Sequence, residues 1–464
     1  MSLLTQLPEI LEKARKEYEA AHAGLYDIVE IMGLGQNAEN LLAKRENVPA
    51  KKQNVLAKGE NLAFMKYLTE EKGLMGGIKL IYVDPPFYSG SNYQASLKIE
   101  SPLLKDIPSI RPLVYDDRWD DGLEGYLTML CARLYMMRDL LSEDGSIWVH
   151  LDWHVVHFVK ILMDAIFGEK NFINEIIWQY KSGGTSKNHF SRKHDTLLFY
   201  GKNAKPMLNI PSEKSYNRGY KPYRFKGVKE YKDDMGWYTM VNMKDVWQID
   251  MVGRTSGERT GYATQKPEAL ISRILESCTA EGDLCADFFC GAGTLAATAQ
   301  KMNRRWLACD MGSLAVTATE KRLAKDQGQF TLLIQQDLSK KGNGLLTIRG
   351  EFPETPFTDK KLVRFTLEDY RLHVEDLPLE DESRQVVESI LEADPLQLID
   401  YWSVDFDYDG QYHRPTMCFT KGKDRIETVC EKMHDRFGLV SVRVCDVFGN
   451  SYFHMLDMTG HHHE

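Results

Sequence analysis

The chain has 464 residues, of which 43% are hydrophobic and 27% are charged, and this composition indicates a globular protein of two or three domains. No stretch reaches the roughly 18 consecutive apolar residues that a membrane-spanning helix needs, and the charged N-terminal pattern is not that of a signal peptide. The eight cysteines form no Cys-x-x-Cys pair, which argues against a zinc ribbon and favours reduced thiols in a cytosol.

The net charge of −9 is unevenly distributed along the chain. Residues 181–232 carry 13 Lys and Arg against three acidic side chains, whereas residues 365–410 carry 14 acidic side chains against two Arg. This division predicts one module that meets a polyanion and another that stays away from it. The alternative for the basic stretch is ordinary solvated surface charge.

The sequence alternates between candidate strands and helices through most of its length. The segment at 78–83 is apolar apart from Lys79, which is typical of a parallel strand buried on both faces. A long loop at 88–121 interrupts the alternation, and loops of that length are usually functional. The predicted strands lie at 54–57, 78–83, 146–151, 174–180, 284–288 and 306–309, and the predicted helices at 62–72, 125–141, 154–167, 266–278, 294–302 and 313–325.

This pattern predicts an α/β fold with one doubly wound, mostly parallel sheet built from two separated segments. We expect an N-terminal helical region at 1–50, catalytic segments at 51–180 and 256–344, a basic insert at 181–255, and an acidic C-terminal α+β module at 345–464. In that module we predict strands at 362–367, 402–408, 417–420 and 440–447, and helices at 383–392 and 424–437. Residues 460–464 are typical of a purification tag.

A glycine turn follows the predicted strand at 284–288. Gly291 and Gly293 lack side chains, so backbone N–H groups and a helix N-terminus can approach a ligand closely. Asp310 ends the next strand, where an acid can accept both hydroxyls of a ribose. These features favour a nucleoside site, the alternative being a tight turn alone. The absence of a third glycine argues against a dinucleotide.

The stronger signal is Asp84-Pro85-Pro86-Phe87 at the end of the strand at 78–83. Two prolines cannot continue a sheet, so the chain leaves the strand in a rigid conformation. Asp84 and the carbonyl after it can then accept hydrogen bonds from an exocyclic amine, and Phe87 can stack on its ring, which is worth about 1–3 kcal/mol. The alternative is a structural turn at the strand end.

Together these motifs resemble those of S-adenosylmethionine-dependent DNA amino-methyltransferases. The resemblance rests on Asp84-Pro85-Pro86-Phe87, on the stretch from Asp287 to Thr294, and on Thr264-Gln265-Lys266-Pro267. Their order is that of the circularly permuted β class, whose fold is Rossmann-like. Residues 119–122, 144–152 and 167–178 further resemble the modification subunits of type III restriction–modification systems.

The resemblance implies that S-adenosylmethionine is the cofactor and that N6 of adenine in DNA is the methyl acceptor. Glu60 stands where the class carries an acid that accepts from the cofactor's adenine amine, although Asp is commoner there. Phe87 stands where Tyr is commoner, and Asp84 in place of Ser favours adenine over cytosine N4. Lys266 matches a contact to the cofactor's carboxylate. The resemblance assigns the cofactor site to Glu60, Lys266, Asp287, Phe289, Gly291, Gly293, Thr294 and Asp310.

The target base must leave the duplex to reach such a site, at a cost of a few kcal/mol. The basic insert is then interpreted as the region that recognises double-stranded DNA, and the loop at 88–121 as a segment that closes over the flipped base. The cationic residues assigned to DNA are Lys181, Lys187, Arg192, Lys193, Arg218, Lys221, Arg224 and Lys226.

Several alternatives stay open at this point. The chain can be a DNA-recognition subunit with little turnover alone, a cytosine-N4 methyltransferase, or a methyltransferase acting on RNA or on glutamine. A homodimer and a helicase–nuclease restriction partner are both compatible with the resemblance, which implies a prokaryotic cytoplasm. Methyl transfer from a sulfonium needs no metal, so we expect none and interpret His150, His154 and His157 as structural or surface histidines.

Overall fold

The computed structural model describes residues 3–33, 53–101, 103–104, 106–181, 184–253, 255–338, 344–353, 355, 360–422, 425–434 and 438–458. The tag-like residues 460–464 and residues 34–50 of the expected N-terminal region lie outside these ranges. Within them, no helix is both long and apolar enough to cross a membrane.

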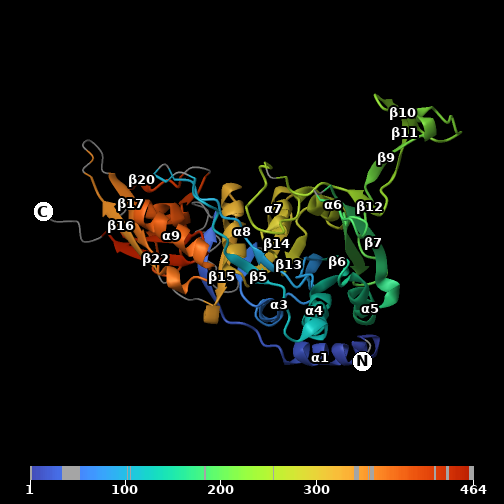
Figure 1. Cartoon of the computed structure of the whole chain (residues 1–464), viewed down its shortest axis with the longest axis horizontal. Helices are drawn as coiled ribbons and strands as arrows, with labels where there is room; N and C mark the ends of the chain where they lie inside the picture. The colour runs from blue at the N-terminus through green and yellow to red at the C-terminus, as the bar shows by residue number, and fades with distance from the viewer. Residues whose placement is uncertain are drawn as a thin grey trace.

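A ten-stranded sheet forms the centre of the molecule (Figure 1). Its strands from β15 to β6 are all parallel, as predicted, and β1 and β8 pair antiparallel with this parallel core. The strand order is β1 (Tyr26–Met32), β15 (Phe330–Gln335), β2 (Val55–Lys58), β14 (Arg305–Asp310), β13 (Leu284–Asp287), β3 (Ile78–Val83), β6 (Leu141–Leu151), β8 (His194–Gly201), β7 (Phe172–Gln179) and β12 (Val246–Gln248).

Helices cover both faces of this sheet, as a doubly wound fold requires (Figure 1). Those whose side chains share a core on one face are α1 (Leu3–Ala20), α3 (Asn61–Glu70), α4 (Gly122–Leu140) and α5 (Val156–Phe167). Those that share the core of the opposite face are α6 (Glu268–Cys278), α7 (Thr294–Lys301) and α8 (Ser313–Lys325).

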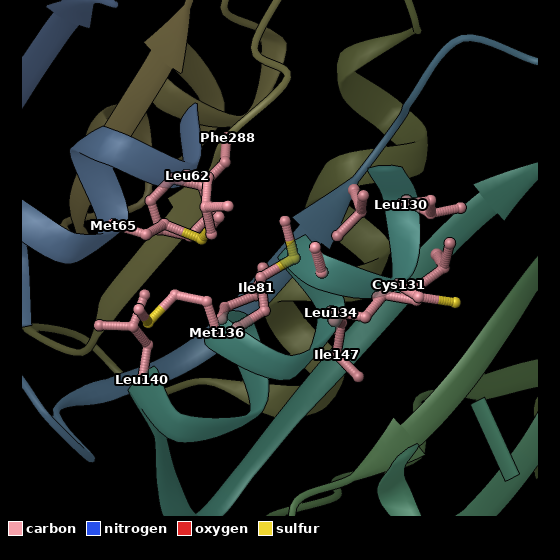
Figure 2. Close-up of a cluster of buried hydrophobic side chains, with 14 of the residues drawn as sticks. Leu62, Met65, Ile81, Leu130, Cys131, Leu134, Met136, Leu140, Ile147 and Phe288 are labelled. Atoms are coloured by element: carbon pink, nitrogen blue, oxygen red, sulfur yellow. The ribbon is translucent and has the colours of Figure 1, made fainter. Parts of the chain in front are cut away.

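The two cores follow directly from the side-chain alternation of the strands. In β3, Ile81 and Val83 belong to the core under α3 and α4, whereas Leu80 and Tyr82 belong to the core under α6 and α7. Successive side chains of a strand point to opposite faces, so a strand buried on both faces must be apolar throughout. Figure 2 shows the first core, where side chains from α3 and α4 meet Ile81 and Ile147 of the sheet.

The basic stretch is divided between the central sheet and a small separate sheet. Its strand β8 lies inside the ten-stranded sheet between β6 and β7, and β12 pairs with β7, so the insert as predicted at 181–255 includes two strands of the main sheet. Only a three-stranded sheet projects from the body (Figure 1). Its strands are β9 (Ser212–Tyr216), β10 (Glu230–Asp233) and β11 (Gly236–Asn242).

The N-terminal region contains a helix and a strand, so the prediction of a helical region over 1–50 was wrong for residues 26–32. α1 ends at Ala20, and residues 26–32 form strand β1, which pairs antiparallel with β15. The apolar side chains of this segment fit a helical period as well as a strand, and its partner is about three hundred residues away. Local periodicity therefore could not identify it.

The C-terminal module is α+β, as predicted, with two antiparallel sheets and one long helix. One sheet contains β16 (Leu345–Glu351), β17 (Lys361–Arg371) and β20 (Val429–His434); the other contains β18 (Ile399–Tyr408), β19 (Met417–Thr420), β21 (Leu439–Asp446) and β22 (Ser451–Asp457); the helix is α9 (Asp381–Ala393). The helix expected at 424–437 was wrong, because Val429–His434 pair as β20 with β17. That pairing buries Cys430 in the module core, a tertiary contact that overrides the local pattern.

A buried charge cluster joins the module to the edge of the central sheet. Arg443 of β21 forms ion pairs with Glu30 of β1 and with Glu320 of α8, and the three side chains are 3%, 0% and 1% exposed. The Tyr401 hydroxyl donates to Glu30 over 2.6 Å. Because the carboxylates share one guanidinium, removal of Arg443 leaves two buried like charges without the cation that pairs with both.

We expect Arg443→Met to lower the free energy of unfolding by about 3–5 kcal/mol, the usual cost of breaking a buried ion pair. Arg364→Met is the matched control, because Arg364 pairs with Glu431 on an exposed surface of the same module, where such pairs contribute about 0–1 kcal/mol. Denaturant midpoints measure both effects. Equal shifts for the two variants would show that the buried cluster does not stabilise the junction.

Candidate active site

The two motifs meet at one edge of the sheet because their strands are neighbours. β3 and β13 run parallel with Tyr82 opposite Asp287, so both strands end at the same edge. Asp84 and Gly291 line the same cavity of about 700 Å³, a size typical of small-molecule sites. The prediction of one sheet built from two separated segments is therefore confirmed.

Most residues assigned to catalysis and to the cofactor line this cavity. Among the described residues, the lining includes Asp84, Pro85, Pro86, Phe87, Glu60, Lys266, Asp287, Phe289, Gly291, Thr294 and Asp310. Gly293 and the eight cationic residues assigned to DNA are not among the lining residues. The cavity thus combines the amine motif with the nucleoside motif.

Asp84 lies at the centre of the amine motif and has one paired and one unpaired oxygen. Its Oδ2 accepts a hydrogen bond from Lys266 Nζ over 2.5 Å, and its Oδ1 is buried without a hydrogen-bond partner among the described residues. The same ammonium lies 5.2 Å from the centre of the Phe87 ring. A buried acceptor without a donor costs free energy, so Oδ1 indicates a site that a ligand N–H can satisfy.

Next to Asp84 lies a buried polar network of Tyr82, His150 and Asp195. The sequence motifs did not predict that these side chains interact. His150 Nδ1 is 2.7 Å from the Tyr82 hydroxyl and 4.0 Å from Asp84 Oδ1, and His150 Nε2 is 3.3 Å from Asp195. Burial acts to raise the pKa of Asp195, but its hydrogen bond with His150 and nearby positive charge outweigh this, so the pKa lies below the usual value. The hydroxyl of Tyr180 also donates to Asp195, over 3.1 Å. His150 is thus a structural histidine, as predicted, and it lies directly beneath the candidate catalytic carboxylate.

The glycine turn is closed by the carboxylate that the sequence assigned to a ribose. Asp310 accepts hydrogen bonds from the backbone N–H of Gly291 over 2.9 Å and of Gly312 over 2.8 Å. Each carboxylate oxygen can accept more than one hydrogen bond, so these contacts leave acceptor capacity on the cavity side. The role predicted for Asp310 stays a prediction, with holding the turn as a second role that the structure adds.

Gly293 acts through packing. Its φ of +66° lies in the left-handed region, and a Cβ there would lie 2.4 Å from Thr319 Cγ2. Gly293 precedes α7 directly, so its conformation sets the path of the turn into that helix. Glycine is therefore required at this position by the neighbouring helix, whatever the cavity binds.

Glu60 begins α3 and is held by partners that the sequence did not reveal. Its side chain accepts from the backbone N–H of Ala63 over 2.7 Å and forms an ion pair with Arg133 of α4. Arg133 also donates to the side chain of Asn61 over 2.5 Å. All three side chains line the cavity. Arg133 comes from α4, about seventy residues after Glu60 and Asn61, so no spacing in the sequence could group it with them.

Burial gives the cavity two carboxylic acids with altered proton affinity. It raises the pKa of Asp287 well above the usual range, and the charges of Asp84 and Asp310 act in the same direction while the N–H of Phe289 opposes them. Burial also raises the pKa of Asp310, against the N–H groups of Gly312 and Gly291. Raised pKa values mean that a cationic ligand near these groups would favour their ionised form. These two carboxyl groups therefore suit a positively charged ligand.

The loop at 88–121 forms a wall of the cavity. It contains the hairpin of β4 (Asn92–Gln94) and β5 (Leu113–Asp116), whose Tyr93 and Tyr115 rings stack at 4.7 Å and line the cavity. Asp117 is buried and holds the loop by accepting from the backbone N–H of Ser89 over 2.7 Å. Closure of this loop over a base stays a prediction.

The cationic residues assigned to DNA form two groups. The first, at 181–193, follows β7 near the cavity: Tyr180, which lines the cavity, donates its N–H to the carbonyl of Lys193 over 3.0 Å. Here the Arg192 guanidinium lies 3.7 Å from the centre of the Trp153 ring. The second group lies in the connection between β9 and β10 of the projecting sheet. Its exposed members are Arg218, Lys221, Arg224 and Lys226.

A comparison with protein-family models finds a match to the DNA methylase family of the N6 and N4 type over residues 78–321, which is more than half of the chain. The matched range runs from the start of β3 to α8 and includes both motifs of the cavity.

Individual relatives are more distant. The type II methyltransferase M.EcaI of Enterobacter cloacae is 26% identical over 322 residues, which are 56% of this chain and 68% of that protein. The EcoP15I Mod subunit of Escherichia coli, a type III restriction–modification enzyme, is 27% identical over 141 residues, which are 28% of this chain but only 22% of that protein. The solved PvuII cytosine-N4-specific DNA methyltransferase shares 16% identity at a TM-score of 0.40, covering 59% of this chain and 88% of its own.

Substitution of Gly293 tests whether the turn depends on packing against Thr319. Gly293→Ala should lower the free energy of unfolding by about 1–3 kcal/mol more than Gly73→Ala, because overpacking adds to the cost of a left-handed alanine. Gly73 is a matched control with a φ of +59° and no atom within 4 Å of a built Cβ. Denaturant unfolding of both variants measures the difference, and equal losses would contradict the packing role.

Proposed function

The chain belongs to the N6/N4 DNA methylase family, and we propose that it transfers a methyl group from S-adenosylmethionine to N6 of adenine in DNA. The observation that supports this most strongly is Asp84: a carboxylate fixed at the end of β3, with one buried oxygen lacking a donor, in the cavity that also contains the glycine turn. The adenine amine has two N–H groups. One of them can donate to Oδ1 without replacing a hydrogen bond from another described residue.

The chemistry assigned to Asp84 follows from the electronic structure of the amine. Its lone pair is delocalised into the ring, which makes the amine a poor nucleophile. Acceptance of its N–H groups by Asp84 and by the backbone carbonyl after it favours tetrahedral nitrogen and exposes the lone pair. Phe87 and the two prolines keep the ring and the acceptors in place, which is the orientation part of the rate enhancement.

The cofactor site fits the residues that surround the glycine turn. When bound, S-adenosylmethionine supplies the methyl group on a positively charged sulfur. Gly291, Glu60 and Lys266 line the cavity: the proposal assigns close approach to Gly291, the adenine amine to Glu60, and the cofactor's carboxylate to Lys266. Burial raises the pKa values of Asp287 and Asp310, and a bound sulfonium or ammonium beside them would favour their ionised forms.

Adenine is the preferred base because the amine motif begins with Asp84, whereas the family also includes enzymes that act on cytosine N4. Mass spectrometry of nucleosides from methylated DNA distinguishes N6-methyladenine from N4-methylcytosine. A chain that recognises DNA without turnover is the other outcome of the same assay, and single-turnover conditions detect it.

DNA contact is assigned to the two cationic groups and to base flipping, since the amine inside a duplex cannot reach the cavity. The three-stranded sheet projects from the body (Figure 1), and Arg218 and Lys221 lie between its strands β9 and β10, so they can touch phosphates beyond the flipped base. We further infer a restriction–modification setting in a prokaryotic cytoplasm from the named relatives, with a second copy or a restriction subunit as partners.

Removal of the central carboxylate tests the mechanism. Asp84→Ala should lower the single-turnover rate of DNA methylation by about 100-fold or more, the usual size for loss of a positioned polar group in a transition state. Binding of S-adenosylmethionine should remain measurable by calorimetry. Asp381→Ala, which removes an exposed carboxylate on α9, is the control and should leave the rate unchanged. A normal rate for Asp84→Ala would refute the assigned role.

The contact of the projecting sheet with DNA can be measured separately. The double variant Arg218→Ala/Lys221→Ala should weaken duplex binding and make the dependence of log Kd on log salt shallower by up to about 2, roughly one for each lost phosphate contact. Arg15→Ala/Lys16→Ala, on exposed positions of α1, is the matched control. Identical salt slopes for the two double variants would place DNA elsewhere on the molecule.

A further inference from the structure

We infer that Lys266 couples the cofactor to the target base: its ammonium pairs with Asp84, and the cofactor's carboxylate draws it away and so frees Asp84 to accept the amine. This inference rests on the proposed function and assigns Lys266 a positioning role in addition to binding. It begins from the pair itself, in which Lys266 Nζ lies 2.5 Å from Asp84 Oδ2 and the side chains are 10% and 18% exposed.

The ammonium has few alternatives to Asp84. Its other hydrogen bond in the described part of the chain goes to the carbonyl of Thr264 at 3.5 Å, which is a long contact. The carboxylate is also the dominant electrostatic partner, since two charges this close and this shielded attract more strongly than in water. The pair is therefore a stable arrangement that a ligand must compete with.

The pair also obstructs the amine site. One oxygen of Asp84 is occupied by the ammonium, and the ammonium lies 5.2 Å from the centre of the Phe87 ring, where a flipped base is expected to stack. A carboxylate already neutralised by a cation is a weaker acceptor for a neutral amine. The base and the ammonium thus compete for the same carboxylate: the ammonium on Oδ2 weakens Oδ1 as an acceptor for the amine.

The backbone of Lys266 is tied to the cofactor half of the cavity. Its carbonyl accepts from the Thr294 hydroxyl over 3.1 Å, at the first residue of α7 behind the glycine turn. The flexible side chain therefore starts beside the cofactor motif and ends on the amine motif. A carboxylate bound near the turn can take the ammonium without any movement of the backbone.

Two sites that compete for one cation are coupled, and the coupling is reciprocal. If a cofactor carboxylate releases Asp84, then base capture must strengthen carboxylate binding by the same factor, typically 5–150-fold for such coupling. A nucleoside that fills the adenosine site but lacks the amino-acid end cannot release Asp84. This difference separates the proposed coupling from a general tightening of the cavity.

The test uses the whole chain and a duplex with 2-aminopurine next to the adenine that sequencing identifies as methylated, so that the target keeps its N6 amine and its extrusion unstacks the fluorescent neighbour. Fluorescence reports base extrusion with S-adenosylhomocysteine, which carries the carboxylate but no transferable methyl group, and with 5′-methylthioadenosine, which lacks the amino-acid end. At saturation, S-adenosylhomocysteine should increase the equilibrium constant for extrusion at least 5-fold over 5′-methylthioadenosine. A ratio below 2-fold in the wild-type protein overturns the proposal.

Two variants should each show a gain, one in base extrusion and the other in affinity for S-adenosylhomocysteine. Loss of structure would produce neither gain. Lys266→Met should extrude the base without nucleoside more readily than the wild type and should respond equally to both nucleosides. Asp84→Asn should bind S-adenosylhomocysteine several-fold more tightly, with unchanged affinity for 5′-methylthioadenosine. Unchanged or weaker binding of S-adenosylhomocysteine by Asp84→Asn, or weaker extrusion by Lys266→Met, overturns the proposal.

The same measurements separate this inference from the proposed function. If the wild-type protein methylates no DNA, the proposed function fails and the coupling has no substrate. If it methylates adenine and both nucleosides act alike, only the coupling fails. Unchanged affinity for 5′-methylthioadenosine shows that the adenosine half of the cavity is intact in each variant.

Discussion

The parallel pairing of β3 with β13 is the constraint on which the rest of the site depends. These strands come from segments about two hundred residues apart, and their register places Tyr82 opposite Asp287. Parallel strands end at the same edge, so the amine motif after β3 and the glycine turn after β13 must share that edge. The intervening chain is free to differ, and it carries the basic residues and the projecting sheet.

Charge balance determines what this edge can hold. Asp84, Asp287 and Asp310 are among the carboxylates that line the cavity, and Lys266 is the cation paired with Asp84. Burial opposes ionisation of Asp287 and Asp310, so their pKa values are raised and a cation improves the site.

The sequence predicted the central fold well because its strands are buried on both faces. β3, β13 and β14 are apolar apart from Lys79 and charged residues at strand ends, and glycines or prolines follow β3 and β13, so local pattern and tertiary structure agree. It failed where a distant partner decides the conformation, as for β1, which is set by β15, and for β20, which is set by β17.

The same reasoning explains which site residues were found. Asp84 and Gly291 stand in contiguous motifs, so spacing alone identified them. Arg133 and His150 reach the site from α4 and β6 through side-chain contacts, and no spacing in the sequence records those contacts.

The acidic C-terminal module packs against the loop whose hairpin forms the cavity wall. Ile99 and Ile110, from the loop at 88–121, are buried in the hydrophobic core of the C-terminal module and not in either core of the catalytic sheet. Polar contacts support this attachment, including one from Ser101 to Asp394 over 2.7 Å. The hairpin that carries Tyr93 and Tyr115 thus spans the cavity at one end and the module at the other. Because Arg443 anchors the same module to β1 and α8, the position of the cavity wall is tied to the far edge of the central sheet through a second, independent connection.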